Sequence, residues 1–105
     1  MAENGKFRVE KFNGQNFSLW KMQMEDYLYQ KDLYLPLGGK TKKPKDIDDE
    51  EWNLLDRKAL RTIRLCLATS VAFNILKETT TEGLIKALEK LYEKPLASNK
   101  VFLMK

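Results

Sequence analysis

The chain has 105 residues, among them 19 basic and 15 acidic side chains, one cysteine and no histidine. This composition predicts one domain, 1–105, and excludes a Cys/His zinc site, a Ser-His-Asp triad and an internal disulfide. No apolar run is long enough for a membrane span, and the net charge of +4 permits polyanion binding without implying it.

The first fifteen residues, 1–15, are expected to form an extended arm. Phe7 and Val9 alternate with polar residues, Phe12 follows out of step, and Asn13-Gly14 is a turn pair. Because a single strand has no partner of its own, this arm must pack on another element.

The spacing of apolar residues after Asn16 predicts a first helix, with Asn16 as its N-terminal cap. Its core stripe recurs every three or four residues and consists of Phe17, Trp20, Met24, Tyr27 and Leu28. The other side of this helix is also apolar and carries Leu19, Met22, Tyr29 and Leu33. Two explanations stay open: the helix lies centrally in a bundle, or the second face contacts another copy of the protein.

A lysine-rich loop and an acidic run follow. The loop carries Lys40, Lys42, Lys43 and Lys45 without periodicity, which is typical of a solvated segment. The run 46–51 contains five acids, and within it Asp48 and Glu51 have the spacing of a capping box at the start of a helix.

The second predicted helix is the clearest element. Its core stripe consists of Trp52, Leu55, Ala59, Ile63 and Cys66, and the opposite face carries Arg57, Arg61 and Arg64. Cys66 is expected to be a small buried hydrophobe rather than a nucleophile. Asp56 lies at the edge of the stripe, where it either binds a neighbouring helix end or is an exposed carboxylate.

Three further helices are expected. A short one falls within 71–77, and Thr79 with Glu82 then has the spacing of another capping box. The helix after this box should end at Lys94-Pro95 and bury Leu84, Leu88 and Leu91, flanked by Ile85 and Tyr92. The last segment, 98–105, has no stop signal, and we interpret it as the start of a helix that leads into a missing downstream domain.

The near-motifs for chemistry fail on their spacing. Gly39-Lys40-Thr41 resembles the end of a phosphate-binding loop, but Tyr34 stands where that loop needs its first glycine. The alternating acids from Asp46 have Glu51 where a calcium loop needs glycine and Arg57 where it needs a bidentate acid. The sequence therefore predicts no enzyme, no cofactor and no metal site.

Short motifs follow one another along the chain in a definite order. They are Lys11-Phe12-Asn13-Gly14 with Asn16-Phe17-Ser18-Leu19-Trp20, Met24 and Leu28; Trp52, Asp56, Ala59 and Ile63-Arg64-Leu65; Thr80 with Gly83, Leu88-Glu89 and Leu91-Tyr92; and 96–103 with Asn99-Lys100. This ordered set resembles the N-terminal part of the Gag polyproteins of copia-type LTR retrotransposons of plants, from about Phe7 to Lys105.

The resemblance implies a capsid-like domain, similar to the N-terminal domain of retroviral capsids, that self-assembles into virus-like particles around element RNA. It implies the protein itself as the main partner, RNA held mainly by downstream Gag segments, and a cytoplasmic location with a nuclear fraction. No membrane partner is expected. The alternatives are a nucleic-acid- or polyanion-binding module and a domesticated Gag-derived adaptor.

These observations together predict an all-α fold: a compact bundle of about five helices with a short extended arm at its N-terminus. The expected core residues are Trp20, Trp52, Ile63, Leu88, Leu91 and Tyr92. The candidates for self-assembly are Leu19, Met22, Tyr29, Leu33, Val101 and Phe102. The candidates for polyanion binding are Lys40, Lys42, Lys43, Lys45, Arg57, Arg61 and Arg64.

Overall fold

The computed structural model describes residues 9–93. Over this range the fold is all-α, as predicted, and it contains no strand. The elements are α1 (Phe17–Gln30), η2 (Leu35–Gly38), η3 (Lys40–Lys42), α2 (Asp49–Leu65), α3 (Thr69–Phe73) and α4 (Thr81–Tyr92), where η denotes a 3₁₀-helix. The expected last helix, with Val101 and Phe102, lies outside the described residues.

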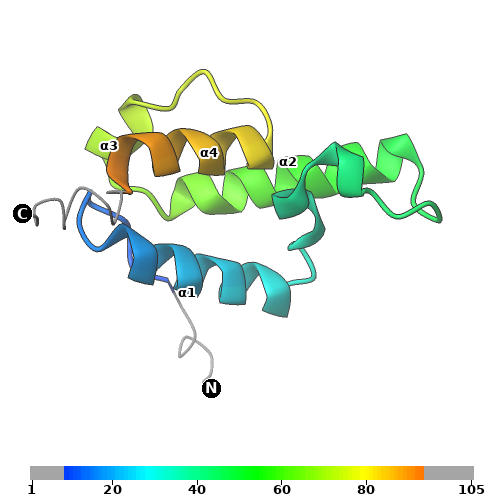
Figure 1. The fold of residues 1–105 in the computed structure, drawn as a ribbon, viewed down its shortest axis with the longest axis horizontal. Coiled ribbons are helices and arrows are strands. Elements are labelled where there is room, and N and C mark those ends of the chain that lie inside the picture. The colour runs from blue at the N-terminus through cyan, green and yellow to red at the C-terminus, as the bar shows by residue number, and fades with distance from the viewer. Residues whose placement is uncertain (1–8, 94–105) are drawn as a thin grey trace, which may run out of the picture.

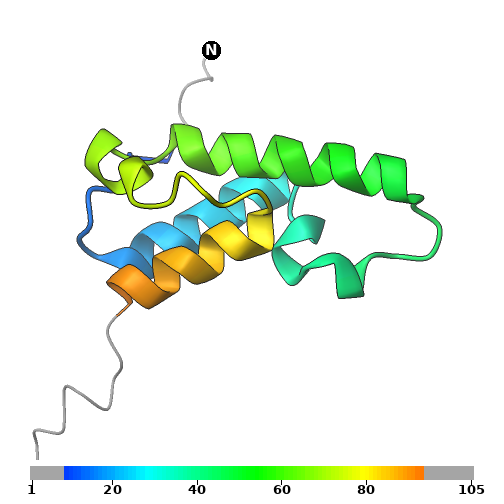
Figure 2. The same cartoon turned by 90° about the horizontal axis from the view of Figure 1, so that it is seen from above.

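Helices α1, α2 and α4 surround a shared core (Figure 1), and the view from above shows α2 along one side of the molecule (Figure 2). An ion pair of 2.7 Å between Lys21 and Glu89 joins α1 to α4. The core includes Trp20 and Met24 from α1, and Leu84 and Leu88 from α4. Of the predicted stripe on α2, Trp52, Ala59 and Ile63 are buried, whereas Leu55 and Cys66 are half-buried; Leu60, outside the predicted stripe, is buried as well.

The N-terminal arm packs across the connection between α2 and α3. The backbone N–H of Phe12 donates to the carbonyl of Cys66, and the N–H of Ala68 donates to the carbonyl of Phe12, each at 2.9 Å. The ring of Phe12 is buried, with its centroid 5.0 Å from that of Trp20 and 5.1 Å from that of Tyr92. The arm therefore finds the partner that its sequence requires, and it gives the core a central aromatic ring.

The two ends of α1 differ from the sequence prediction. Asn16 precedes the helix, but its backbone is left-handed (φ 57°) and its side chain makes no capping hydrogen bond. At the other end Asp32 is also left-handed (φ 60°), and the N–H of Leu33 donates to the carbonyl of Leu28 at 2.8 Å. This is a Schellman turn, which ends the helix and directs the chain back toward the core.

Leu33 therefore does not extend the outer face of α1, contrary to its predicted place there. It lies beyond the helix end at Gln30 and is half-buried against the core. The sequence pattern alone places it on the outer face because the pattern extends past the point where the turn at Asp32 ends the helix.

The start of α2 is as predicted: the carboxylate of Asp48 accepts a hydrogen bond from the N–H of Glu51 at 2.8 Å. The start of α4 falls one residue later than predicted. Its cap is Thr80, whose hydroxyl accepts from the N–H of Gly83 at 3.0 Å, rather than Thr79. The short helix α3 begins two residues before the expected segment.

Leu91 is the one expected core residue that the structure places outside the core, with 54% of its surface exposed. It lies in the last turn of α4, at the C-terminal end of the stripe that runs through Thr81, Leu84 and Leu88. The half-buried ring of Tyr92 closes this end of the core instead, edge-on to Phe12. The other expected core residues within α1 and α2 are buried.

Candidate functional site

The N-terminus of α4 is fixed to α2 by two hydrogen bonds. The carboxylate of Asp56 accepts from the backbone N–H of Thr81 at 2.9 Å, and the hydroxyl of Thr81 donates to the backbone carbonyl of Asp56 at 2.9 Å. Thr81 is fully buried. Of the two alternatives for Asp56, the structure shows the first, a carboxylate that binds a neighbouring helix end.

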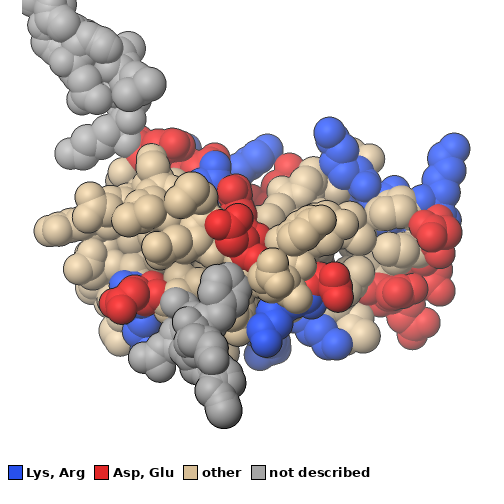
Figure 3. Space-filling view, turned by 90° about the horizontal axis from the view of Figure 1, so that it is seen from below, with Lys and Arg blue, Asp and Glu red and all other residues tan. Residues whose placement is uncertain are grey.

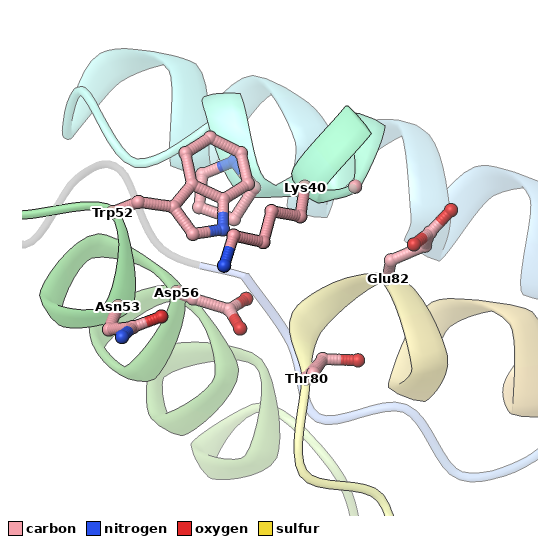
Figure 4. A pocket seen from close by; sticks show the side chains of 8 residues that line it. Lys40, Trp52, Asn53, Asp56, Thr80 and Glu82 are labelled. Atoms are coloured by element: carbon pink, nitrogen blue, oxygen red, sulfur yellow. The ribbon is translucent and has the colours of Figure 1, made fainter. Parts of the chain in front are cut away.

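Beside this joint lies a hollow of about 140 Å³, between the 36–40 loop, α2 and the start of α4 (Figure 4). Its lining includes Lys40, Asp56, Thr80 and Glu82. Each of these polar groups already has a partner in the chain: Lys40 pairs with Asp49, Glu82 pairs with Lys86, and Asp56 and Thr80 cap α4. The hollow therefore belongs to the joint that positions α4.

Residues 9–93 show no arrangement typical of a metal site, a membrane-spanning helix or a reactive thiol. No group of three or more His, Cys, Asp or Glu side chains there is placed to hold a metal ion. In the same residues, no helix is long and apolar enough to cross a membrane. Burial raises the pKa of the half-buried Cys66 thiol, against a smaller lowering by the charge of Lys11, and a raised pKa leaves less thiolate for reaction.

The outer face of α1 exposes three of the residues predicted for self-assembly. Leu19 and Met22 are each 52% exposed, and Tyr29 is 61% exposed. The ring of Tyr29 lies 4.8 Å from that of Tyr34, which continues the exposed aromatic surface beyond the helix. We call Leu19, Met22 and Tyr29 the α1 outer face.

The residues predicted to bind polyanions fall into two separate groups. The lysine loop lies at the N-terminus of α2, where Lys40 and Lys43 approach the carboxylate of Asp49 at 3.9 and 3.6 Å. Lys43 also donates to the backbone carbonyl of Ile47. Arg61 is twelve residues further along α2 than Asp49, or about 18 Å. The structure thus places Lys40 and Lys43 apart from Arg61, and Asp49 partly neutralises these two lysines.

Arg57 and Arg61 instead share a face of α2 with an acidic and an apolar residue. Glu50, Leu54, Arg57 and Arg61 are all exposed on the side of α2 opposite the buried Trp52. We call these four residues the α2 outer face. Acidic side chains gather at the end of the molecule where α2 begins (Figure 3). The helical spacing from Glu50 onward is the signal that could have revealed this face, since steps of four, three and four residues keep one side of a helix.

Comparison with known proteins identifies the class. The chain is 42% identical over 101 residues to the retrovirus-related Pol polyprotein from transposon TNT 1-94 of Nicotiana tabacum. The match covers 95% of this chain and 8% of that polyprotein, so the chain spans a small part of its relative. No family profile and no solved structure matches the chain. The chain is a retrotransposon protein. It belongs to the copia type, as its motifs predict.

Proposed function

We propose that this chain is a structural, Gag-like domain whose role is self-association during particle assembly. The proposal is supported by its relationship to a copia-type polyprotein and by the α1 outer face, which leaves Leu19, Met22 and Tyr29 exposed. Leu19 and Met22 are three residues apart on one side of α1, and large apolar side chains that gather on a surface mark a contact site. In this proposal the domain is not an enzyme, and it acts in cytoplasmic particles with a nuclear fraction.

The partner in this proposal is another copy of the chain. Assembled shells use many small contacts, so each contact should be weak and the isolated domain monomeric or dimeric at ordinary concentrations. Element RNA would be held mainly by other segments of the polyprotein, because the lysine loop pairs in part with Asp49 and lies apart from the arginines.

The test is the double variant Met22→Lys with Tyr29→Glu. Unpaired charges placed in an apolar contact are costly to bury, so the variant should lose concentration-dependent association in sedimentation velocity. Electron microscopy should likewise show that a polyprotein carrying both changes forms no particles. A matched control is Thr69→Glu with Ser70→Lys, which introduces the same charges at exposed positions of α3.

Normal association and normal particles from the Met22/Tyr29 variant would refute the role of the α1 outer face. Loss of the helical circular-dichroism signal in that variant would show that these side chains support the core instead. The control variant should behave as the unmodified chain in both measurements.

A further inference from the structure

The α2 outer face has a symmetrical spacing. Glu50, Leu54, Arg57 and Arg61 follow one another at intervals of four, three and four residues and lie within about 60° of arc on an α-helix. The spacing is the same when read in either direction. Two antiparallel copies of this helix would therefore place position 50 of each opposite position 61 of the other, and position 54 opposite position 57.

The charges match this antiparallel register. Glu50 of each copy would face Arg61 of the other, which gives two ion pairs across the two-fold axis. Leu54 would lie against the aliphatic stem of Arg57, because arginine covers apolar surface with its methylene groups while its guanidinium stays in water. A parallel arrangement would instead set Glu50 against Glu50 and Arg61 against Arg61, which like-charge repulsion disfavours.

The N-terminal, acidic half of the α2 outer face lies beside a hollow that could receive a side chain of a second copy. A shallow hollow there is lined by Asp48, Glu50, Glu51, Leu54 and Arg57. None of its three carboxylates forms an ion pair with a lysine or arginine of residues 9–93. A guanidinium with five N–H donors suits a hollow edged by carboxylates, and Arg61 of a second copy would reach it in the register above.

The position of α2 leaves this face accessible. The helix runs along one side of the molecule, and no other helix of the described residues lies on its outer side (Figure 2). Leu65, at the C-terminal end of the same side, is 76% exposed. Along the helix, Glu50 and Arg61 are about 16 Å apart, so one pairing would engage three turns of each copy.

We propose that two copies of this chain associate through antiparallel pairing of their α2 outer faces, with Glu50 of each bound to Arg61 of the other. This inference rests on the proposed self-association and assigns it a second, ionic contact distinct from the apolar α1 outer face. A contact through one helix face is smaller than a standard protein interface, so it is weak by itself and salt-sensitive.

The test exchanges charges between two variants of the full chain, Glu50→Arg and Arg61→Glu. Each variant alone sets like charges against each other at both pairs, and its self-association should weaken about tenfold or more. Mixed together, the two variants restore opposite charges at both pairs, so the mixture should associate as the unmodified chain does. The double variant Glu50→Arg with Arg61→Glu, in one chain, should also recover association. Sedimentation velocity over a concentration series, at low and high salt, measures the association of the two single variants, of their mixture and of the double variant.

A mixture that associates no better than either variant alone would overturn this inference, as would an unmodified chain that stays monomeric up to the highest concentration tested. Glu50→Gln removes the pair without adding a positive charge near the helix N-terminus, and should weaken association less than Glu50→Arg. If Arg61→Glu lowers RNA binding and leaves sedimentation unchanged, the face is a nucleic-acid surface and the inference is wrong. If the charge exchanges have no effect while Met22→Lys with Tyr29→Glu abolishes association, the proposed function stands and only the α2 contact fails.

Discussion

Helices α1 and α2 contribute to one core but are held in it by different means. Helix α2 begins at a side-chain cap on Asp48 and is fixed to α4 through Asp56. Helix α1 has left-handed residues at both ends and no side-chain cap, and is held by aromatic packing and the Lys21–Glu89 ion pair.

Their outer faces differ in the same way. The three side chains of the α1 outer face are uncharged and surround one exposed carboxylate, that of Asp26, while the α2 outer face combines one leucine with charges of both signs. Added salt should therefore leave an α1 contact intact and weaken an α2 contact, since salt screens exposed charges and does not weaken apolar burial. Ionic strength therefore distinguishes the two proposed contacts, because only the α2 contact should respond to added salt.

The largest difference in stability is expected between variants on the two sides of α2. Trp52 is 3% exposed, and Trp52→Ala should lower the free energy of unfolding by roughly 3–5 kcal/mol, because it leaves a cavity in the core. Leu54→Ala, two residues away on the outer face, should change it by less than about 0.5 kcal/mol. Urea denaturation followed by circular dichroism measures both, and equal midpoints for the two variants would contradict the assignment of the faces.

A smaller effect should follow from removing the connection between α2 and α4. Asp56→Ala leaves the N–H of the buried Thr81 without its acceptor, at a cost of about 1–3 kcal/mol. Asp56→Asn retains an oxygen that can accept this hydrogen bond and should lose less. The same urea titration distinguishes them, and an Asp56→Ala midpoint equal to that of the unmodified chain would show that water replaces the carboxylate.

The ion pair between Lys21 of α1 and Glu89 of α4 should stabilise the fold to an extent that depends on pH. The hydrogen bond to Glu89 raises the pKa of Lys21 above its usual value of 10.5, although partial burial opposes the rise. Because the pKa is higher in the folded chain, the stabilisation is fully present below pH 10.5 and is lost as pH rises through the folded-state pKa.

Lys21→Met should therefore be less stable than the unmodified chain by about 0.5–1 kcal/mol near neutral pH. This difference in stability should shrink at strongly alkaline pH. There Lys21 of the unmodified chain loses its proton and becomes uncharged, as the methionine of the variant is. Urea midpoints of both proteins at the two pH values give the difference directly, and a gap independent of pH would mean that the packing of the lysine stem, not its charge, stabilises the fold.

Much of this fold can be predicted from sequence because charge, caps and apolar spacing agree in α2. Asp48 and Glu51, the stripe through Trp52 and Ile63, and the arginines opposite them all indicate the same helix. The periodicity of apolar residues does not predict features that depend on the local backbone conformation or on a neighbouring element. It does not indicate, for example, that the turn at Asp32 ends α1.

The candidate surfaces were predictable only in part. The apolar pattern of α1 identified Leu19, Met22 and Tyr29, whose exposure the structure shows. The sequence pattern predicts the arginines of α2 as a basic stripe and Glu50 as one of the first-turn acids, whereas the structure places Glu50 on the same face as Arg57 and Arg61. Likewise, helical spacing defines a stripe without showing whether a neighbouring element covers its end, so it predicts Leu91 in the core although the structure exposes it.

The smallest effect concerns the C-terminal end of α1, where α1 lacks the favourable termination that α2 has at its start. Asp32 has a left-handed backbone that costs an aspartate more than a glycine, and its negative charge lies beside the negative end of the helix dipole. Asp32→Gly should therefore raise the free energy of unfolding by about 0.5 kcal/mol, after the greater chain entropy of glycine in the unfolded state is subtracted. Asp32→Asn removes only the charge while keeping a residue that tolerates this backbone, so it should recover part of the gain. Thermal unfolding of the three proteins separates the two causes: equal gains would assign the cost to charge alone, and a loss of stability in Asp32→Gly would show that the chain entropy of glycine in the unfolded state outweighs both costs.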